Sequence, residues 1–304
     1  MINIFKKTKI AYFISAFTGV ALIFFIFESL VPQLVLGLFS LVWIFIIALF
    51  FNGIAFRHLA KMLSSANAHC QVEQSLNNLY GIYRANTNKK SDLIVAIYIC
   101  NLLSHFGKYE MALKMILEYN PDALLKGKKE VIFKYYYYDI LVTCYSCLEQ
   151  KEKAIEALKK VKECLDNKHF NPKLKDKYEI HYKTMYYTVI DGEKKPEEIL
   201  PLLEKMNDGN ILLSTVSAEY ATVSWLKKFK MDDEIQPHID FIKENGGDTF
   251  YAKCANNNDF SSDFIKQIND EKWEPTPKKY KNNKELIISI IAAVVVVAII
   301  IICW

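Results

Sequence analysis

The sequence predicts an all-α protein in which a repeat of helical hairpins lies between hydrophobic segments at the two ends of the chain. Residues 10–27, 29–56 and 286–304 contain no charged residue. Between these stretches, apolar residues recur at every third or fourth position, as on one face of a helix. Turn residues interrupt the pattern about every 40 residues, a spacing typical of helical repeats. We therefore divide the chain into an N-terminal transmembrane hairpin (1–56), a connecting amphipathic helix (57–90), a helical repeat domain (91–270), a basic polar linker (271–285) and a C-terminal transmembrane helix (286–304).

Composition excludes several classes of protein. The 304 residues are 52% hydrophobic and 24% charged, with only 10 Gly and 8 Pro, unlike a collagenous or low-complexity chain. The 7 Cys are sparse and odd in number, unlike those of a secreted module held by disulfides. The net charge is +4, but residues 57–271 hold 30 basic and 31 acidic side chains. We therefore expect no nucleic-acid partner.

The first two uncharged stretches predict a membrane hairpin. Ile10–Phe27 and Leu34–Phe51 are each long enough, or nearly so, for a bilayer core of roughly 30 Å. Pro32 lies between them and cannot continue a helix interior. A cleaved signal peptide is the alternative interpretation. It is disfavoured because no small-residue cleavage site follows the first stretch and a second span comes at once.

The third stretch predicts a C-terminal tail anchor, because its 19 residues present no polar face to water. Lysines precede the first span, basic residues follow the second, and a lysine cluster precedes the third. Under the positive-inside rule these flanks place the body of the protein in the cytoplasm. We therefore expect a multi-pass integral protein of the cell membrane. The basic residues that support this orientation are Lys6, Lys7, Lys9, Arg57, His58, Lys61, Lys278, Lys279, Lys281 and Lys284.

The body begins with an amphipathic helix and a first helical pair. Residues 57–86 continue from the second span as a helix, and the polar residues 86–90 form a loop. A helix is then expected over 91–106, although Leu93–Cys100 is apolar all round and a buried strand is a real alternative. Gly107 separates this segment from a second helix, which Asn120-Pro121 ends.

Three more pairs follow in order. The helical period indicates helices over 131–148 and 151–165, over 172–189 and 196–206, and over 213–226 and 232–242. Asn171-Pro172 is a typical cap and first-turn pair. Pro201 predicts a kink or a late start in its helix. Residues 248–270 add one or two short helices, and 271–285 form a polar linker.

Individual residues then point to a family. Residues 101–121 read NLLSHFGKYEMALKMILEYNP and resemble a tetratricopeptide repeat. Gly107, Tyr109 and Ala112 stand where that family has its small turn residue, its aromatic residue and its inner-face alanine. Tyr145 and Ala154 match the family in the second pair. The resemblance covers 91–166 well and 172–245 less closely. The sequence departs from the family in having no consensus Trp, in having Glu149 at the place of the turn glycine, and in its varying repeat lengths.

The resemblance implies a TPR-like α-solenoid whose concave surface binds a peptide or helix of a partner protein. The first helix of each pair would line that surface. Because the implied positions include no paired lysines, a clamp for a chain-terminal carboxylate is not expected. The positions carried over from the family are Ile97, Asn101, Ser104, His105, Asp139, Thr143 and Ser146.

The search for catalytic and metal motifs favours no enzyme. Cys144 and Cys147 form a CxxC, but no second pair stands at zinc spacing, and two small buried residues on a helix are the simpler interpretation. The histidines form no HExxH, and no P-loop, GxSxG or GxGxxG occurs. We therefore expect no cofactor, no metal and no small-molecule substrate. An enzyme site assembled from distant residues stays a third hypothesis.

Two functions follow from the sequence. The first is an integral membrane scaffold or adaptor that presents a cytoplasmic protein-binding surface, with the lipid bilayer and a protein or peptide as partners. The alternative is a structural subunit of a membrane complex. In that case the hairpin would pack against other spans through the small residues Ala16, Gly19 and Gly37.

Overall fold

The computed structural model describes residues 4–27, 31–83, 89–190, 195–206 and 211–277. All regular secondary structure in these ranges is helical, which confirms the all-α prediction. The described chain forms two compact units, one up to Met62 and one from Leu63 onward. Each unit is described by itself below.

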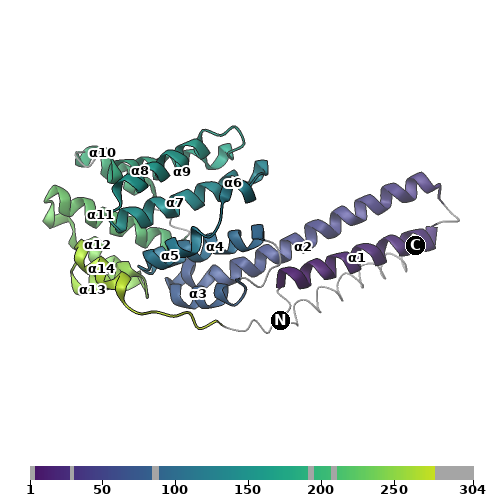
Figure 1. Cartoon of the computed structure of the whole chain (residues 1–304), viewed down its shortest axis with the longest axis horizontal. Helices are drawn as coiled ribbons and strands as arrows, with labels where there is room; N and C mark the ends of the chain where they lie inside the picture. Colours follow the sequence, from purple (N-terminus) through teal and green to yellow (C-terminus); the bar gives the residue numbers. More distant parts are fainter. Residues whose placement is uncertain (1–3, 28–30, 84–88, 191–194, 207–210, 278–304) are drawn as a thin grey trace. The chain divides into compact units, whose positions relative to one another are not determined.

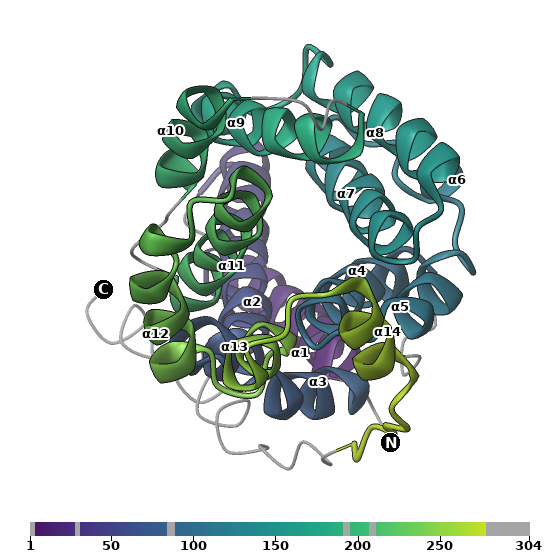
Figure 2. The same cartoon turned by 90° about the vertical axis from the view of Figure 1, so that its left-hand side faces the viewer.

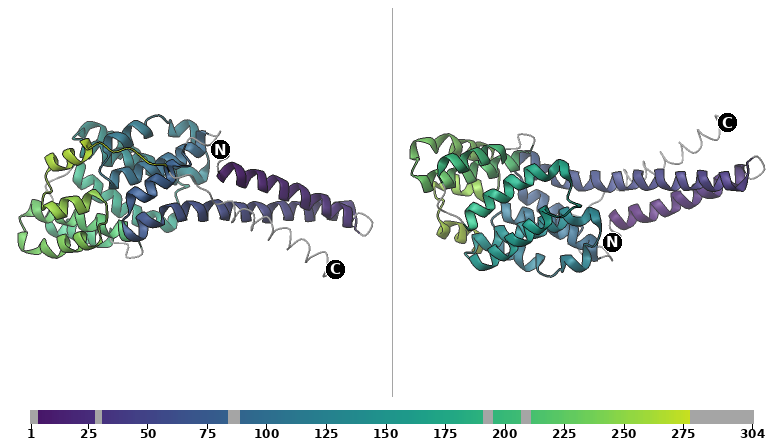
Figure 3. Two further views of the ribbon diagram at one scale, coloured as in Figure 1. Left: turned by 90° about the horizontal axis from the view of Figure 1, so that it is seen from below. Right: turned by 90° about the horizontal axis from the view of Figure 1, so that it is seen from above.

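The first unit is a helical hairpin. Its helices are α1 (Ile4–Phe27) and the larger part of α2 (Gln33–His69), which lie side by side (Figure 1). Ala16 of α1 and Ile47 of α2 form the buried contact, with Tyr12, Trp43 and Ile44 around it. The Trp43 Nε1–H donates to the Ser15 carbonyl at 3.3 Å. Figure 3 shows the two helices from two further sides.

The hairpin depends on a close approach at Gly19. A Cβ atom at this position would lie 1.8 Å from Nε1 of Trp43. No side chain larger than hydrogen fits such a contact without displacing the indole ring. Gly19 therefore fixes the approach of the two helices. The small residues at 16 and 19 are both used inside the hairpin, whereas a Cβ at Gly37 would meet nothing within 4 Å.

The outer surface of the hairpin is apolar. Large hydrophobic side chains on both helices are exposed, and Phe17 and Phe25 are 77% and 86% accessible. Judged by length and hydropathy, the helices of the described residues do not include a membrane-crossing one. The predicted C-terminal segment 286–304 lies outside the described residues. The other exposed hydrophobic residues of the hairpin are Phe13, Ile14, Phe24, Leu34, Leu38, Phe39, Leu41, Val42, Phe45 and Ile46.

The second unit contains the end of α2 and a series of shorter helices. Single 3₁₀ turns, Lys128–Glu130 and Asp232–Glu234, precede α7 and α12. The described helices after α2 are α3 (Val72–Tyr80), α4 (Lys89–His105), α5 (Tyr109–Ile116), α6 (Pro121–Leu124), α7 (Val131–Cys147), α8 (Lys151–Leu165), α9 (Pro172–Val189), α10 (Pro196–Met206), α11 (Leu212–Phe229), α12 (Gln236–Asn245), α13 (Phe250–Asn257) and α14 (Ser262–Asp270).

The predicted connecting helix is broken in two. Cys70 has a φ of 51°, in the left-handed region that ends a helix. Its N–H donates to the Ala66 carbonyl and the Gln71 N–H donates to the Ser65 carbonyl, each at 3.0 Å. The chain then turns into α3, and the Ser75 hydroxyl accepts from the Ala66 N–H at 3.0 Å. The apolar periodicity of residues 57–86 indicates helix on both sides of Cys70. It does not indicate the turn at Cys70, because no Gly or Pro stands there.

Helices α4 and α5, α7 and α8, α9 and α10, and α11 and α12 pack as adjacent pairs, as the sequence predicts. Leu93–Cys100 lies within α4, so the strand alternative was wrong. The interior of α10 includes Pro201, so this helix does not start late. The short helices expected in 248–270 are α13 and α14. Residues 97 and 99, both in α4, are 2% and 0% exposed, because neighbouring helices cover α4 on several sides.

Three of these pairs share one turn. Gly107, Glu149 and Lys230 all have left-handed φ angles, of 80°, 58° and 59°. In each turn the N–H of the following residue bonds to the carbonyl five residues before it, at 2.8, 2.8 and 3.0 Å. This bond is the helix ending that favours glycine. Glu149, the sequence departure from the family, therefore occupies the same backbone geometry as Gly107.

The shared turn predicts opposite effects for two substitutions. Glu149→Gly is expected to raise the free energy of unfolding by about 1 kcal/mol, because glycine has no steric penalty in the left-handed region. Gly107→Ala is expected to lower it by about 2 kcal/mol or more, because its Cβ would lie 2.9 Å from Cβ of Phe250 and 2.8 Å from Ile268. Thermal melting of the two variants checks both. A Gly107→Ala variant as stable as the wild type would contradict the turn assignment.

The last helices of the second unit, α13 and α14, pack against its first helices. We call the contacts between them the closure. Figure 2 shows the pairs following one another around a closed path, with α13 and α14 beside α3, α4 and α5. At this closure Lys108 is only 2% exposed. Its ammonium group donates to the carbonyls of Ile268 and Glu271, the latter at 2.6 Å. The Glu110 N–H donates to the Asn269 side chain at 3.1 Å. Carbonyls at the end of α14 are therefore satisfied by the first helical pair.

A second contact of the closure caps α3. Both oxygens of Asp248 accept from backbone N–H groups at the start of α3, those of Val72 at 2.6 Å and Glu73 at 3.0 Å. Burial raises the pKa of Asp248, and these two bonds oppose the rise. Gly247 has a φ of 56°, and a Cβ there would lie 2.5 Å from the Cys70 carbonyl oxygen. The closure therefore depends on a glycine beside the carboxylate.

Residues 271–277 then cross α3. The Trp273 Nε1–H donates to Glu73 at 3.1 Å, and its ring lies 5.4 Å from that of Phe106. The Thr276 N–H donates to the Asn77 side chain at 2.7 Å. The first residues of the second unit therefore lead directly into α3, and its last described residues, 271–277, pack against the same helix.

Candidate functional site

The best candidate site is a set of hydrogen-bonded polar side chains contributed by successive helical pairs. We call His105, Asp139, His181, Ser217 and Tyr251 the inner polar cluster. They come from α4, α7, α9, α11 and α13, and in Figure 2 these helices surround the middle of the second unit. Four of the five helices are the first of their pair, except α13. The family resemblance predicts that such helices line the concave face.

His105 is the last residue of α4 and links three helices. Its Nδ1 lies 2.8 Å from the Tyr251 hydroxyl, which donates to the Ser217 hydroxyl at 3.0 Å. Because the Tyr251 hydroxyl donates its only proton to Ser217, its oxygen accepts a hydrogen bond from the Nδ1–H of His105. Burial lowers the pKa of His105 to about 4, a shift opposed by the charge of Asp139 and reinforced by His181. His105 is therefore a neutral hydrogen-bond donor at neutral pH.

Asp139 and His181 form the second part of the cluster. The Asp139 carboxylate lies 3.0 Å from Nε2 of His181, and the two side chains are 16% and 35% exposed. Burial disfavours the charged imidazole, but the charge of Asp139 and its hydrogen bond outweigh burial and raise the pKa of His181. The pair therefore keeps a carboxylate and an imidazole in contact with solvent.

A spacing of 42 residues relates the contacts between neighbouring pairs. Asp139 and His181 are 42 positions apart, and so are Tyr136 and Tyr178, whose hydroxyls also bond. The turn residues Gly107 and Glu149 have the same separation. Equivalent positions of successive pairs therefore stack on each other, as in a helical repeat.

The residues predicted from the resemblance fall into different environments. His105 and Asp139 belong to the inner polar cluster, and Asn101 is exposed. Thr143 is half-buried, whereas Ile97 and Ser104 are buried, at 2% and 6% exposure. The Ser104 hydroxyl donates to the Asn101 carbonyl at 2.7 Å. The Ser146 hydroxyl is buried, and within the described part of the chain it has no hydrogen-bond partner.

Sequence reasoning missed three members of the cluster. His181, Ser217 and Tyr251 carry no motif, and the histidines were interpreted as scattered. One signal could have found His181, because it stands 42 residues after Asp139, the same distance as Glu149 from Gly107. Tyr251 had no such signal, since it reaches the cluster only through the closure.

The CxxC has the environment of a helix core. Cys144 is fully buried and Cys147 half-buried, and burial raises the pKa of both thiols. A neutral thiol is a poor nucleophile and a poor metal ligand. Among the described residues, no three His, Cys, Asp or Glu side chains are grouped so that they could hold a metal ion.

The cluster predicts a pH dependence of stability. His105 has an ordinary pKa near 6.5 in the unfolded chain and about 4 in the fold. Its contribution is therefore present above pH 6.5 and is lost as the pH falls towards 4, a loss of about 3 kcal/mol. His181 acts in the opposite direction, because its raised pKa stabilises the fold at low pH. In His105→Gln the drop in melting temperature between pH 7 and pH 4.5 is expected to be smaller than in the wild type, whereas equal drops would contradict this assignment.

Comparison with known proteins adds no relative. No family model, no curated protein sequence and no solved structure matches the chain.

Proposed function

We propose that this protein is a membrane-attached, TPR-like scaffold or adaptor whose second unit binds a segment of a partner protein on its inner polar face. The observation that carries the proposal is the inner polar cluster. Successive helices contribute side chains to one face, and that face retains solvent contact at His181 and Asp139. Asn101, a predicted contact residue, is exposed and makes no side-chain bond that the structure records.

The chemistry of this face suits a peptide. The solvent-facing members of the cluster are the Asp139 carboxylate and the His181 imidazole. They offer hydrogen-bonding groups of both kinds, and a peptide backbone needs both donors and acceptors. The half-buried rings of Tyr136 and Tyr178 pack edge to face on the same two helices and add aromatic surface, a feature of protein-binding sites.

The hairpin supports the membrane part of the proposal. Its two helices expose twelve large apolar side chains, and extended apolar surfaces mark sites that contact proteins or membranes. We propose that lipid covers this surface and that segment 286–304 provides the second attachment. Because the second unit begins and ends beside α3, both attachments would leave it from one helix. The positive-inside pattern would then place the second unit in the cytoplasm.

The alternative, a structural subunit, has less support from the hairpin. Ala16 and Gly19 pack against α2 within the hairpin, so they are not free to contact another span. Of the three small residues considered, Gly37 alone lies on an open face. Assembly through small residues would therefore depend on a single glycine, whereas motifs of this kind use pairs.

The proposal is tested by capture of partners from solubilised membranes with the full chain. Asn101→Arg combined with Thr143→Arg is expected to reduce recovery of a specific partner about tenfold, because two long charged side chains would fill the face. The control is Lys151→Glu with Lys159→Glu, at exposed positions of α8. The proposal fails if the arginine variant captures every partner of the wild type at the same yield.

A further inference from the structure

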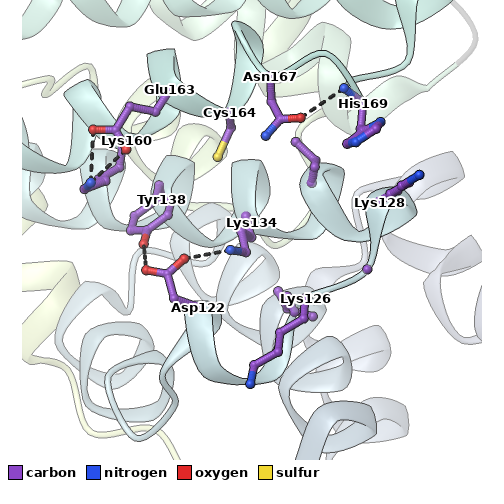
Figure 4. Close-up of a pocket in the computed structure, with 13 residues that line it drawn as sticks. Asp122, Lys126, Lys128, Lys134, Tyr138, Lys160, Glu163, Cys164, Asn167 and His169 are labelled. Atoms are coloured by element: carbon purple, nitrogen blue, oxygen red, sulfur yellow. Dashed lines mark hydrogen bonds and ion pairs between the residues drawn. The ribbon is translucent and has the colours of Figure 1, made fainter.

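The strongest feature outside the inner polar cluster is a cavity beside α6, α7 and α8. Its volume is about 450 Å³, within the range of small-ligand pockets. The walls are the loop 125–128, the N-terminal half of α7 and the last turns of α8 with the residues that follow. We call it the lysine pocket. Figure 4 shows its lining, which consists of Asp122, Leu125, Lys126, Gly127, Lys128, Val131, Lys134, Tyr138, Lys160, Glu163, Cys164, Asn167 and His169.

The floor of the pocket is apolar and consists of buried side chains. Leu125, Val131 and Cys164 are 1%, 9% and 7% exposed. Burial raises the pKa of the Cys164 thiol to about 11, so it is neutral at physiological pH. The floor therefore adds no negative charge, and the charge of the pocket is set by its rim.

The rim carries more positive than negative charge. Its four lysines face two carboxylates, a formal excess of two positive charges. The Asp122 carboxylate accepts from Lys134 at 2.7 Å and from the Tyr138 hydroxyl at 3.4 Å. On the opposite wall Glu163 accepts from Lys160 at 2.7 Å. Hydrogen bonding to Lys134 lowers the pKa of Asp122, and the charge of Lys160 adds to this effect.

The remaining cations have no internal partner that the structure records. Lys126 and Lys128 precede and follow Gly127 in the loop, and both are exposed. In Figure 4 Lys128 lies near His169, and Lys126 lies farther along the loop. His169 stands at the same rim, and only its backbone N–H is engaged, with Asn167 at 2.9 Å. The excess charge is therefore located on side chains that are available to a ligand.

The loop that presents these lysines is fixed in place. The Gly127 N–H donates to the Glu130 carboxylate at 2.8 Å, and Glu130 also pairs with Lys90 of α4. A Cβ on Gly127 would lie 3.0 Å from the carboxyl carbon of Glu130. The backbone between the two lysines is therefore held before a ligand arrives, which reduces the entropy cost of binding.

We propose that the lysine pocket binds a phosphomonoester. A phosphomonoester carries a charge of about −1.5 to −2 at pH 7, which matches the excess of the rim. The cavity has room for more than the phosphate group, so the ligand is a phosphorylated small molecule or lipid headgroup. Lys126 and Lys128 bind the phosphate oxygens, and His169 adds a third donor. Tyr138 and Asp122 face the uncharged hydroxyl groups of the ligand.

The test uses the full chain in lipid nanodiscs. One arm titrates inositol 4-phosphate, which carries a single phosphomonoester, into nanodiscs of neutral lipid, and the other measures flotation with nanodiscs that contain phosphatidylinositol 4-phosphate. Binding in the first arm identifies a soluble phosphate ester, and binding in the second arm alone identifies a headgroup. Either result supports the site, provided that Lys126→Gln with Lys128→Gln weakens it about tenfold or more.

The control pair is Lys151→Gln with Lys159→Gln, which removes the same charge from exposed positions of α8 outside the pocket. It is expected to change affinity less than about twofold, because surface charges at a distance are screened by salt. Equal weakening by both pairs would overturn the proposal and indicate general attraction by positive charge. Lack of binding in both arms at millimolar ligand would also overturn it. Neither result depends on capture of a protein partner, so this test is independent of the proposed function.

Discussion

Lys108→Met is expected to lower the free energy of unfolding of the second unit by about 3 kcal/mol and to release α14 from the first helical pair. The ammonium group of Lys108 satisfies the carbonyls of Ile268 and Glu271 in a site that is 2% exposed. Methionine keeps the apolar stem but leaves these carbonyls without donors. A buried carbonyl left unpaired costs about 1–3 kcal/mol, and the ion-dipole attraction at the end of α14 is lost as well.

Hydrogen exchange of the full chain in detergent checks this prediction. Amides of α13 and α14 are expected to lose protection in Lys108→Met, while those of α7 and α8 keep theirs. Lys114→Met is the matched control, because Lys114 lies on the exposed side of α5 and has no recorded partner. If both variants melted at the wild-type temperature, the closure would not depend on Lys108.

The second large effect concerns chemical labelling of the outer surface of the hairpin. A cysteine placed at Phe45, which is 64% exposed, is expected to react about tenfold or more slowly with a membrane-impermeant maleimide in intact membranes than after detergent is added. Under our proposal lipid covers this side chain, and a charged reagent does not enter hydrocarbon. Reaction of the unsubstituted chain provides the background.

Leu117→Cys is the control for this experiment. Leu117 is 53% exposed in the second unit, so its reaction in opened membranes is expected to be fast with or without detergent. If Phe45→Cys and Leu117→Cys reacted at equal rates in membranes, lipid would not cover the outer surface of the hairpin.

Local patterns predicted most of the helices because helix periodicity is a property of neighbouring residues. The pairs α4–α5 and α7–α8 follow from their apolar spacing and from the turn at Gly107. The turn at Glu149 shows that backbone geometry persists where the preferred residue is absent. The break at Cys70 was missed because the residue that adopts the left-handed conformation is not one that favours it.

The closure could not be predicted from local patterns. Lys108 follows a turn glycine and has the composition of a solvated surface residue, yet its partners stand 160 and 163 positions later. Asp248 caps a helix that begins 176 residues before it. Such contacts between polar groups leave no period in the sequence, and only the folded chain brings them together.

Only part of the candidate site could be predicted, because the repeat pattern covers some of its helices and not others. The repeat resemblance led to His105 and Asp139 because their helices carry the family pattern. It did not lead to Tyr251, which lies in α13 beyond the four pairs. The lysine pocket was missed because its cations come from a loop and from two helices whose charged residues look like ordinary solvated faces.

The most direct test of the central claim is site-specific photo-crosslinking in cells. A photoreactive amino acid is placed at Asn101, which is exposed on α4, and separately at Glu152, which is exposed on α8. A scaffold that binds its partner on the inner polar face is expected to give a discrete crosslinked protein from position 101 and none from position 152. Crosslinking of the partner from position 152 but not from position 101 would contradict the account.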